Sequence, residues 1–204
     1  EAEVFECKDK DGTHLGVLYL DYFPRASKRG GAWCGGYRSQ TYKDGKRVAP
    51  VVTIVCNFTK PSANQPALLT ADEAETMFHE FGHALHSLFR DVHYYGIGGV
   101  PRDFVELPSQ INEHWVFEPE MLKQYAKHYQ TGEVMPTELV EKLDKSGKYG
   151  QGFATVEYVA ASLLDMDFHV LKEIPEDLDV MKFEEETLGK RGLLKQIPSR
   201  YSTT

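Results

Sequence analysis

The chain has 204 residues, enough for one or two domains with a hydrophobic core, and a formal net charge of −8 at pH 7. This negative charge and the lack of any block of basic residues argue against nucleic acid as a partner. No apolar run approaches the ~18 residues of a transmembrane span, so we expect no membrane insertion. The three cysteines are widely spaced and odd in number, which favours reduced thiols and a cytoplasmic location.

The sequence pattern of residues 1–60 predicts a β-rich segment. Short runs of β-branched and aromatic residues alternate with turns such as Asp11-Gly12, which is a hairpin signal. Gly35-Gly36 interrupts one of these runs and would let a neighbouring strand or a substrate strand approach the backbone closely. We therefore expect a small antiparallel sheet with strands over residues 4–7, 15–20, 33–42 and 51–56.

Residues 61–204 have a helical pattern. The stretch Thr70-Ala71-Asp72-Glu73 is a capping box, which marks the start of a helix. A core-facing stripe with helical spacing then follows, made of Phe78, Phe81, Leu85, Leu88 and Phe89. We predict a helix over residues 71–90 and further helices over residues 119–129, 136–145, 152–172 and 183–190.

The first of these helices contains the sequence His79-Glu80-Phe81-Gly82-His83. A step of four residues turns an α-helix by about 400°, so both imidazoles leave the same face about 6 Å apart along the axis. Two imidazole nitrogens at this spacing can bind one zinc ion at about 2.0–2.1 Å. Glu80 is rotated by about 100°, which suits contact with a water on the metal better than contact with the metal. The pattern therefore predicts a zinc peptidase.

Other interpretations of these histidines stay open. Two surface histidines beside a glutamate also occur on ordinary amphipathic helices. His86 shares the face of His79 but lies seven residues away, about 10.5 Å along the axis, which is too far to share one metal ion with both other histidines. We expect His86 to pack against its neighbours or to support the ligands from behind.

A catalytic zinc ion of this type needs a third protein ligand and leaves its fourth position to water. Pro101 predicts the start of a second helix, with Glu106 in its first turns and a kink or restart at Pro108. Glu113 shares the face of Glu106 and could hold a ligand histidine by its second nitrogen. From spacing alone, a surface ion pair explains Glu106 equally well, and an ordinary surface role is favoured for Glu113. The downstream candidates for the third ligand are Glu106, Glu113, Glu118 and Glu120.

Two stretches resemble the signature of the thimet oligopeptidase family of zinc metallopeptidases. They are residues 79–86, His-Glu-Phe-Gly-His-Ala-Leu-His, and residues 101–115, Pro-Arg-Asp-Phe-Val-Glu-Leu-Pro-Ser-Gln-Ile-Asn-Glu-His-Trp. Residues 28–33, 65–69 and 160–166 support the resemblance, which covers nearly the whole chain. Within the family, the sequence is most similar to the bacterial peptidyl-dipeptidases.

The resemblance implies that His79, His83 and Glu106 bind one zinc ion and that Glu80 is the general base. It also implies an α+β fold that is mainly helical, with a zincin-like catalytic core, and cleavage of short peptides rather than folded proteins. Release of C-terminal dipeptides is the expected specificity, and internal cleavage by an oligoendopeptidase is the alternative.

The sequence also departs from the family. Full-length members are several times longer, and beyond the position that matches residues 197–201 they carry a glycine-rich segment with a histidine and tyrosines that bind substrate. No such segment occurs in this sequence, and Tyr201 is not one of those tyrosines. We therefore expect a truncated catalytic region that keeps the zinc ligands and catalyses poorly, because loss of one oxyanion donor costs about 10²–10³ in rate.

Two other functional classes compete with this interpretation. One is a different zinc enzyme of the same two-helix design, such as an aminopeptidase, for which no motif that recognises a free amine is visible. The other is a non-enzymatic module in which the helix serves packing and the metal site is vestigial. The sequence leaves the oligomeric state open.

Overall fold

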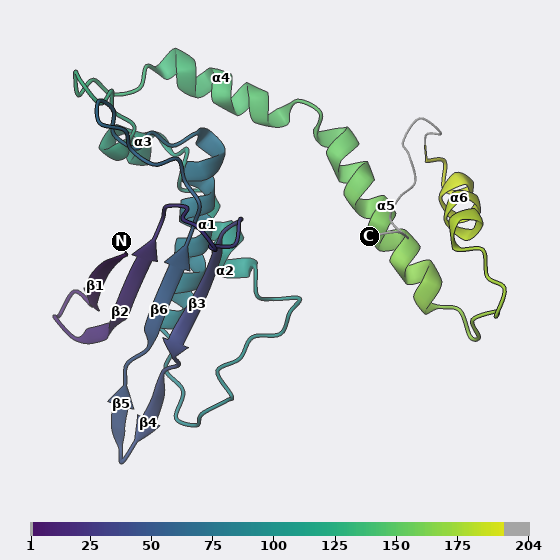
Figure 1. The fold of residues 1–204 in the computed structure, drawn as a ribbon, viewed down its shortest axis with the longest axis horizontal. Coiled ribbons are helices and arrows are strands. Elements are labelled where there is room, and N and C mark those ends of the chain that lie inside the picture. The colour runs from purple at the N-terminus through teal and green to yellow at the C-terminus, as the bar shows by residue number, and fades with distance from the viewer. Residues whose placement is uncertain (1, 194–204) are drawn as a thin grey trace. The chain divides into compact units, whose positions relative to one another are not determined.

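A computed structural model describes residues 2–193 of the chain (Figure 1). Contacts divide the chain into two compact units, residues 1–136 and residues 137–204. The predicted strands and both predicted metal helices belong to the first unit. The division between residues 60 and 61 that we expect from the change of sequence pattern stays a prediction.

The first unit contains a four-stranded sheet in the order β1-β2-β6-β3 (Figure 1). β2 and β6 are parallel, whereas the β1–β2 and β3–β6 pairs are antiparallel. The predicted antiparallel sheet is therefore wrong at its centre, and the sheet is mixed. The chain from β2 to β6 passes through β3 and a hairpin, and a connection of this length can return a strand in the same direction. The strands are β1 (Glu3–Lys8), β2 (His14–Asp21), β3 (Trp33–Arg38) and β6 (Val51–Val55), and the separate hairpin is β4 (Thr41–Lys43) with β5 (Lys46–Val48).

Helix α1 (Ala71–Leu88) begins as the sequence predicts. The Glu73 backbone N–H donates to the Thr70 hydroxyl at 3.2 Å, and the Thr70 N–H donates to the Glu73 carboxylate at 2.9 Å. This reciprocal pair satisfies two N–H groups that a helix start would otherwise leave without partners. The predicted capping box is thus confirmed, and α1 ends at Leu88 rather than at residue 90.

The core of this unit lies between α1 and one face of the sheet. Of the predicted apolar stripe, Leu88 is buried, but Phe81 and Phe89 are 39% and 59% exposed. The face of α1 in this core carries Ala84 and Leu88, with Met77 packed against them. Full burial of each aliphatic side chain in this layer contributes about 1.5–3 kcal/mol. The buried members of the core are Leu18, Val52, Ile54, Cys56, Phe58, Ala84 and Leu88.

Two polar side chains secure the C-terminal end of α1. Arg47 of β5 donates to the backbone carbonyls of Leu88, at 3.1 Å, and of Leu15 in β2, at 3.0 Å. Gln40 donates to the Val92 carbonyl at 3.2 Å and accepts from the Val92 N–H at 2.8 Å. A cation at the end of a helix also complements its dipole. Arg47 therefore ties the last turn of α1 to the sheet.

Replacement of Arg47 by alanine is expected to destabilise the chain by about 1.5–3 kcal/mol, because the part-buried carbonyls of α1 and β2 lose a charged donor. Urea denaturation followed by circular dichroism measures this loss. Lys46→Ala, at an exposed position of the same strand, is the control and should change stability by less than about 0.5 kcal/mol. Equal unfolding midpoints for the two variants would contradict this role of Arg47.

Helix α2 (Leu107–Glu113) begins later than the sequence predicts. Residues 102–106 form turns, and Glu106 is the N-cap residue of α2 rather than a residue inside it. Pro108 lies in the first turn of α2, where its missing N–H costs nothing, so of the predicted kink or restart the structure has a helix start. The next helix, α3 (Pro119–Tyr125), starts at the predicted proline and ends before the predicted residue 129.

The second unit contains three helices within the described residues: α4 (Thr137–Lys148), α5 (Gln151–His169) and α6 (Val180–Lys190). α5 and α6 pack through Ala160, Leu164 and Leu188, with Phe168 and Phe183 beside them. The predicted helices in this region are therefore confirmed with shifted ends. Residues 197–201, where the sequence departs from the family pattern, lie outside the described part of the chain.

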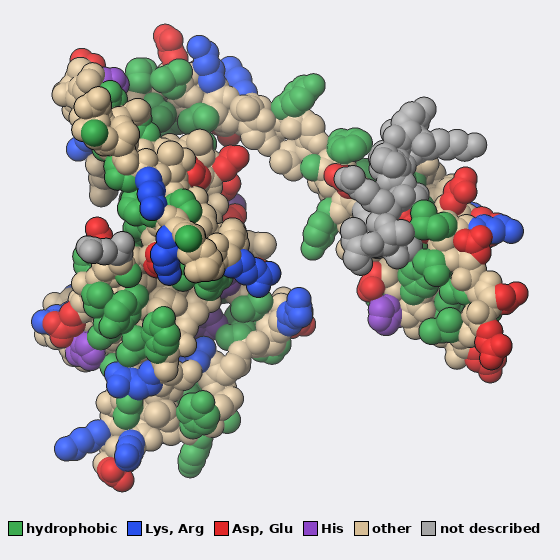
Figure 2. Space-filling model, viewed as in Figure 1, with side chains coloured by type: hydrophobic (Ala, Val, Ile, Leu, Met, Phe, Trp, Pro, Cys, Tyr) green, Lys and Arg blue, Asp and Glu red, His purple; other side chains and the backbone are tan. Residues whose placement is uncertain are grey.

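Many large hydrophobic side chains stay exposed on the described residues of both units (Figure 2). Among residues 2–193, no helix combines the length and the apolar character that a bilayer span requires.

Candidate metal centre

The structure brings His79, His83 and Glu106 together. The Nε2 atoms of His79 and His83 lie 3.2 and 3.1 Å from the same carboxylate oxygen, Oε2 of Glu106. The two imidazole rings are 5.0 Å apart and nearly perpendicular. One donor atom from each of the three residues lies within 4.8 Å of the other two, so the group could hold a metal ion. Two imidazoles with one carboxylate is a ligand set of catalytic zinc sites.

Glu106 reaches the histidines because α2 approaches α1 closely at Gly82. A Cβ atom on Gly82 would lie 2.5 Å from the Pro108 carbonyl oxygen and 2.7 Å from Cα of Ser109, distances that real side chains essentially never show. Asn112 adds a polar link, because its side-chain amide donates to the Phe78 carbonyl at 2.6 Å. The glycine in the middle of the histidine motif therefore sets how near the carboxylate can come.

Glu113 fixes the protonation pattern of His79. Its Oε1 lies 2.5 Å from Nδ1 of His79, and an ionised carboxylate only accepts hydrogen bonds, so Nδ1 carries the proton. The Nε2 atom of a neutral His79 then presents a lone pair to the Glu106 carboxylate. Two lone pairs face each other favourably only with a cation between them, either a metal ion or an extra proton on His79. A metal ion fits this place better than a proton, because it can also bind the third donor atom, Nε2 of His83.

Electrostatics keep the other two donors in the forms that bind metal. Burial lowers the pKa of His83 and favours its neutral imidazole, although the Glu106 charge opposes this shift. The hydrogen bond from Ser109 lowers the pKa of Glu106 most, and the charges of His83 and His79 lower it further. Metal binding requires a neutral imidazole and an ionised carboxylate.

Glu80 is buried beside this group, with only 5% of the residue exposed. Burial raises its pKa most, and the Glu106 charge raises it further, whereas His79 and a hydrogen bond from the Cys34 backbone lower it. Its Oε2 atom is buried and has no hydrogen-bond partner among the described residues. An unpaired buried carboxylate oxygen is costly, so this atom is suited to a group that the protein itself does not supply.

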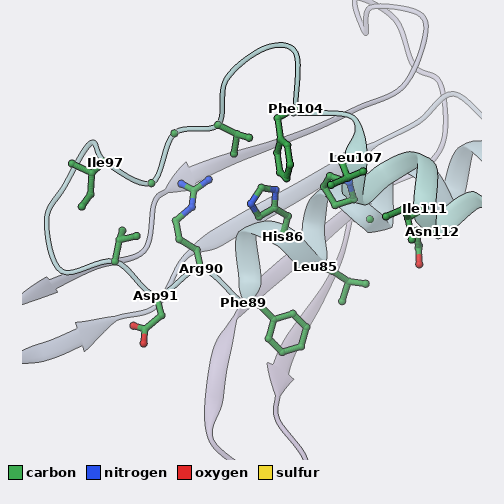
Figure 3. Close-up of a pocket in the computed structure, with 16 residues that line it drawn as sticks. Leu85, His86, Phe89, Arg90, Asp91, Ile97, Phe104, Leu107, Ile111 and Asn112 are labelled. Atoms are coloured by element: carbon green, nitrogen blue, oxygen red, sulfur yellow. The ribbon is translucent and has the colours of Figure 1, made fainter.

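The remaining candidates lie elsewhere. Glu118 is the N-cap residue of α3, and Glu120 pairs with Lys123 at 2.6 Å on the surface. His86 lines a mostly apolar cavity of about 720 Å³ between the C-terminal half of α1, the following loop and α2. In Figure 3, His86 points into this cavity toward Phe104 and Leu107. None of the three candidate ligands lines the cavity, and the role of His86 stays a prediction.

Sequence reasoning missed two residues that shape this centre, Gly82 and Ser109. The Ser109 hydroxyl lies 2.7 Å from Oε2 of Glu106, and the residue is completely buried. A signal was present for each residue. Gly82 lies inside the histidine motif although glycine weakens a helix, and Ser109 follows Glu106 by three residues, a spacing that places two side chains on one helical face.

A methyl group at Gly82 should displace α2 from α1. We expect Gly82→Ala to cost about 1–3 kcal/mol of stability through overpacking, and to weaken zinc binding because Glu106 moves away from the histidines. Gly189→Ala in α6 is the matched control. A Cβ there meets nothing within 4 Å, so the change should be neutral or slightly stabilising and leave zinc affinity unchanged. Thermal unfolding and zinc titration of both variants measure the effects, and wild-type affinity in Gly82→Ala would contradict the expectation.

Comparison with known proteins identifies the family. The profile of Peptidase family M3 matches residues 1–202, and the chain belongs to this family. A dipeptidyl carboxypeptidase of Salmonella typhimurium is 42% identical over 207 residues, which cover 100% of this chain and 30% of that protein. A dipeptidyl carboxypeptidase of Escherichia coli K12 is 43% identical over the same shares of the two chains. An oligopeptidase A of Salmonella typhimurium is 41% identical over 173 residues, 83% of this chain and 25% of that protein.

The family resemblance that residues 79–86 and 101–115 carry is thereby confirmed. The chain spans about 30% of the length of the two dipeptidyl carboxypeptidases that it matches.

Proposed function

We propose that this chain carries the zinc centre of a metallopeptidase that hydrolyses short peptides. The observation that supports this function most is the convergence of His79, His83 and Glu106 beside a buried glutamate with an unpaired oxygen. The surrounding helices and sheet would form a zincin-like core. Membership of Peptidase family M3 supports peptide hydrolysis as the reaction.

In this proposal His79, His83 and Glu106 hold one zinc ion per chain. When bound, zinc would act as a Lewis acid that polarises the scissile carbonyl, and it would lower the pKa of a bound water to about 7. Glu113 keeps the proton of His79 on Nδ1, so that Nε2 is free to bind. The buried position of Ser109 and the contact at Gly82 keep the Glu106 carboxylate near the two histidines.

Glu80 acts as the general base. Its unpaired Oε2 can accept a proton from the attacking water, and the same oxygen can deliver that proton to the leaving amine. Burial raises the pKa of Glu80 toward neutral pH. A base whose pKa lies near the working pH is most effective in taking up and releasing a proton.

For the specificity, we propose release of C-terminal dipeptides. The relatives named dipeptidyl carboxypeptidase match the whole chain, whereas the relative named oligopeptidase A matches 83% of it. Internal cleavage of short peptides is the second candidate, because the identity to oligopeptidase A is nearly as high. A cytoplasmic location is proposed from the three free cysteines.

Replacement of Glu80 by glutamine should leave the zinc content unchanged. In the full-length protein it should lower the rate of peptide hydrolysis about 10²–10⁴-fold, because the amide cannot accept the water proton. Hydrolysis of a defined peptide followed by mass spectrometry measures the rate and the products, and so separates dipeptide release from internal cleavage. Glu120→Gln, an exposed glutamate on α3, should retain full activity. Activity that persists in Glu80→Gln would assign the base to another group.

The ligand set has its own test. His79→Ala and His83→Ala should lose the metal, and Glu106→Ala should bind it much more weakly, because each change removes one of three protein ligands. Elemental analysis of the purified chains after dialysis gives the zinc content per molecule. His128→Ala, a histidine outside the group, should keep one zinc per chain. Full zinc content in either α1 variant would rule out this centre.

A further inference from the structure

Ser109 contacts the Glu106 carboxylate oxygen that both candidate histidine ligands face. Its hydroxyl oxygen lies 2.7 Å from Oε2 of Glu106 and 2.9 Å from the backbone carbonyl of the same residue. Oε2 is also the oxygen that faces the Nε2 atoms of His79 and His83. One buried hydroxyl therefore contacts the same carboxylate oxygen as both candidate ligands on α1.

The hydroxyl has one proton to donate, and the carboxylate is the better acceptor. A hydrogen bond to an ionised oxygen is shorter and stronger than one to a neutral carbonyl, and the shorter distance here is the one to Oε2. The hydroxyl therefore donates to the oxygen that points toward the histidines.

The Glu106 carboxylate needs a hydrogen bond that fixes its orientation. Its side chain is 49% exposed, and its residue precedes the first turn of α2 without any side-chain capping bond. An exposed glutamate samples several rotamers and loses that freedom when it binds a metal ion. A donor fixed in the buried contact between α1 and α2 can hold the carboxylate in one orientation before the ion arrives.

We propose that Ser109 is a positioning residue for the third zinc ligand and holds Oε2 of Glu106 toward His79 and His83. This inference rests on the proposed function, because it presupposes that zinc binds to these three residues. Glu113, also on α2, hydrogen-bonds to His79, so α2 then orients two of the three ligands, His79 and Glu106. The competing explanation is purely structural, with the hydroxyl serving only the Glu106 carbonyl at the start of α2.

Removal of the hydroxyl tests the proposal. Ser109→Ala deletes a single oxygen atom, and we expect the zinc dissociation constant of the chain to rise by about 10–100-fold. Competition with a chromophoric zinc chelator measures this constant, and circular dichroism of the metal-free protein reports folding. Ser162→Ala is the control, because the hydroxyl of that exposed serine on α5 bonds to the Tyr158 carbonyl of its own helix, and the change should leave zinc affinity unchanged. Ser109→Gly, which also lacks the hydroxyl and adds no bulk, should weaken zinc binding in the same direction if the alanine variant misfolds.

A double-mutant cycle separates positioning from structure. If Ser109 acts through Glu106, then Ser109→Ala should weaken zinc binding no further once Glu106→Ala is present. Equal weakening in both backgrounds, or an affinity of Ser109→Ala within twofold of the wild type, would overturn the proposal and leave the zinc centre standing. A wild-type chain that binds no zinc would overturn both this inference and the proposed function.

Discussion

The contact between α1 and α2 at Gly82 is the constraint on which the candidate metal centre depends. The two helices come this close only because Gly82 has no Cβ to meet the backbone of Pro108 and Ser109. Glu106, Ser109 and Glu113 follow one another at spacings of three and four residues, so all three face α1 once the contact forms. A shift of α2 by the width of a methyl group would move all three side chains at once.

The sheet carries none of the candidate metal ligands, yet it sets the surroundings of the proposed general base. Glu80 lies about 100° around α1 from His79, on the side where the helix packs against the strands. Burial there raises the pKa of its carboxyl group, and the Cys34 backbone in β3 donates a hydrogen bond to it, while Oε2 has no partner within residues 2–193. Arg47 and Gln40 hold the far end of α1, so the helix that carries the motif is fixed at several points along its length.

Local features of the sequence were predictable because they act within one or two helical turns. The capping box at Thr70 and the start of α1 needed only neighbours in the chain. The start of α2 was harder, since Pro101 and Pro108 are both good first-turn residues and only the packing on α1 selects the second. The apolar stripe was predicted only in part for a similar reason, because Phe81 and Phe89 have helical spacing but are exposed, whereas Leu88 packs in the core beside Ala84.

The histidine spacing, the glutamate beside it and the helix that holds them could all be read in the order of residues, because a helix converts sequence spacing directly into geometry. Three features needed the folded chain: the parallel pairing of β2 with β6, the bond between Glu113 and His79, and the approach of Ser109 to the Glu106 carboxylate. Each joins elements whose relative placement depends on packing rather than on spacing. Spacing alone even disfavoured a special role for Glu113, since nothing in the order of residues says how closely two helices will lie.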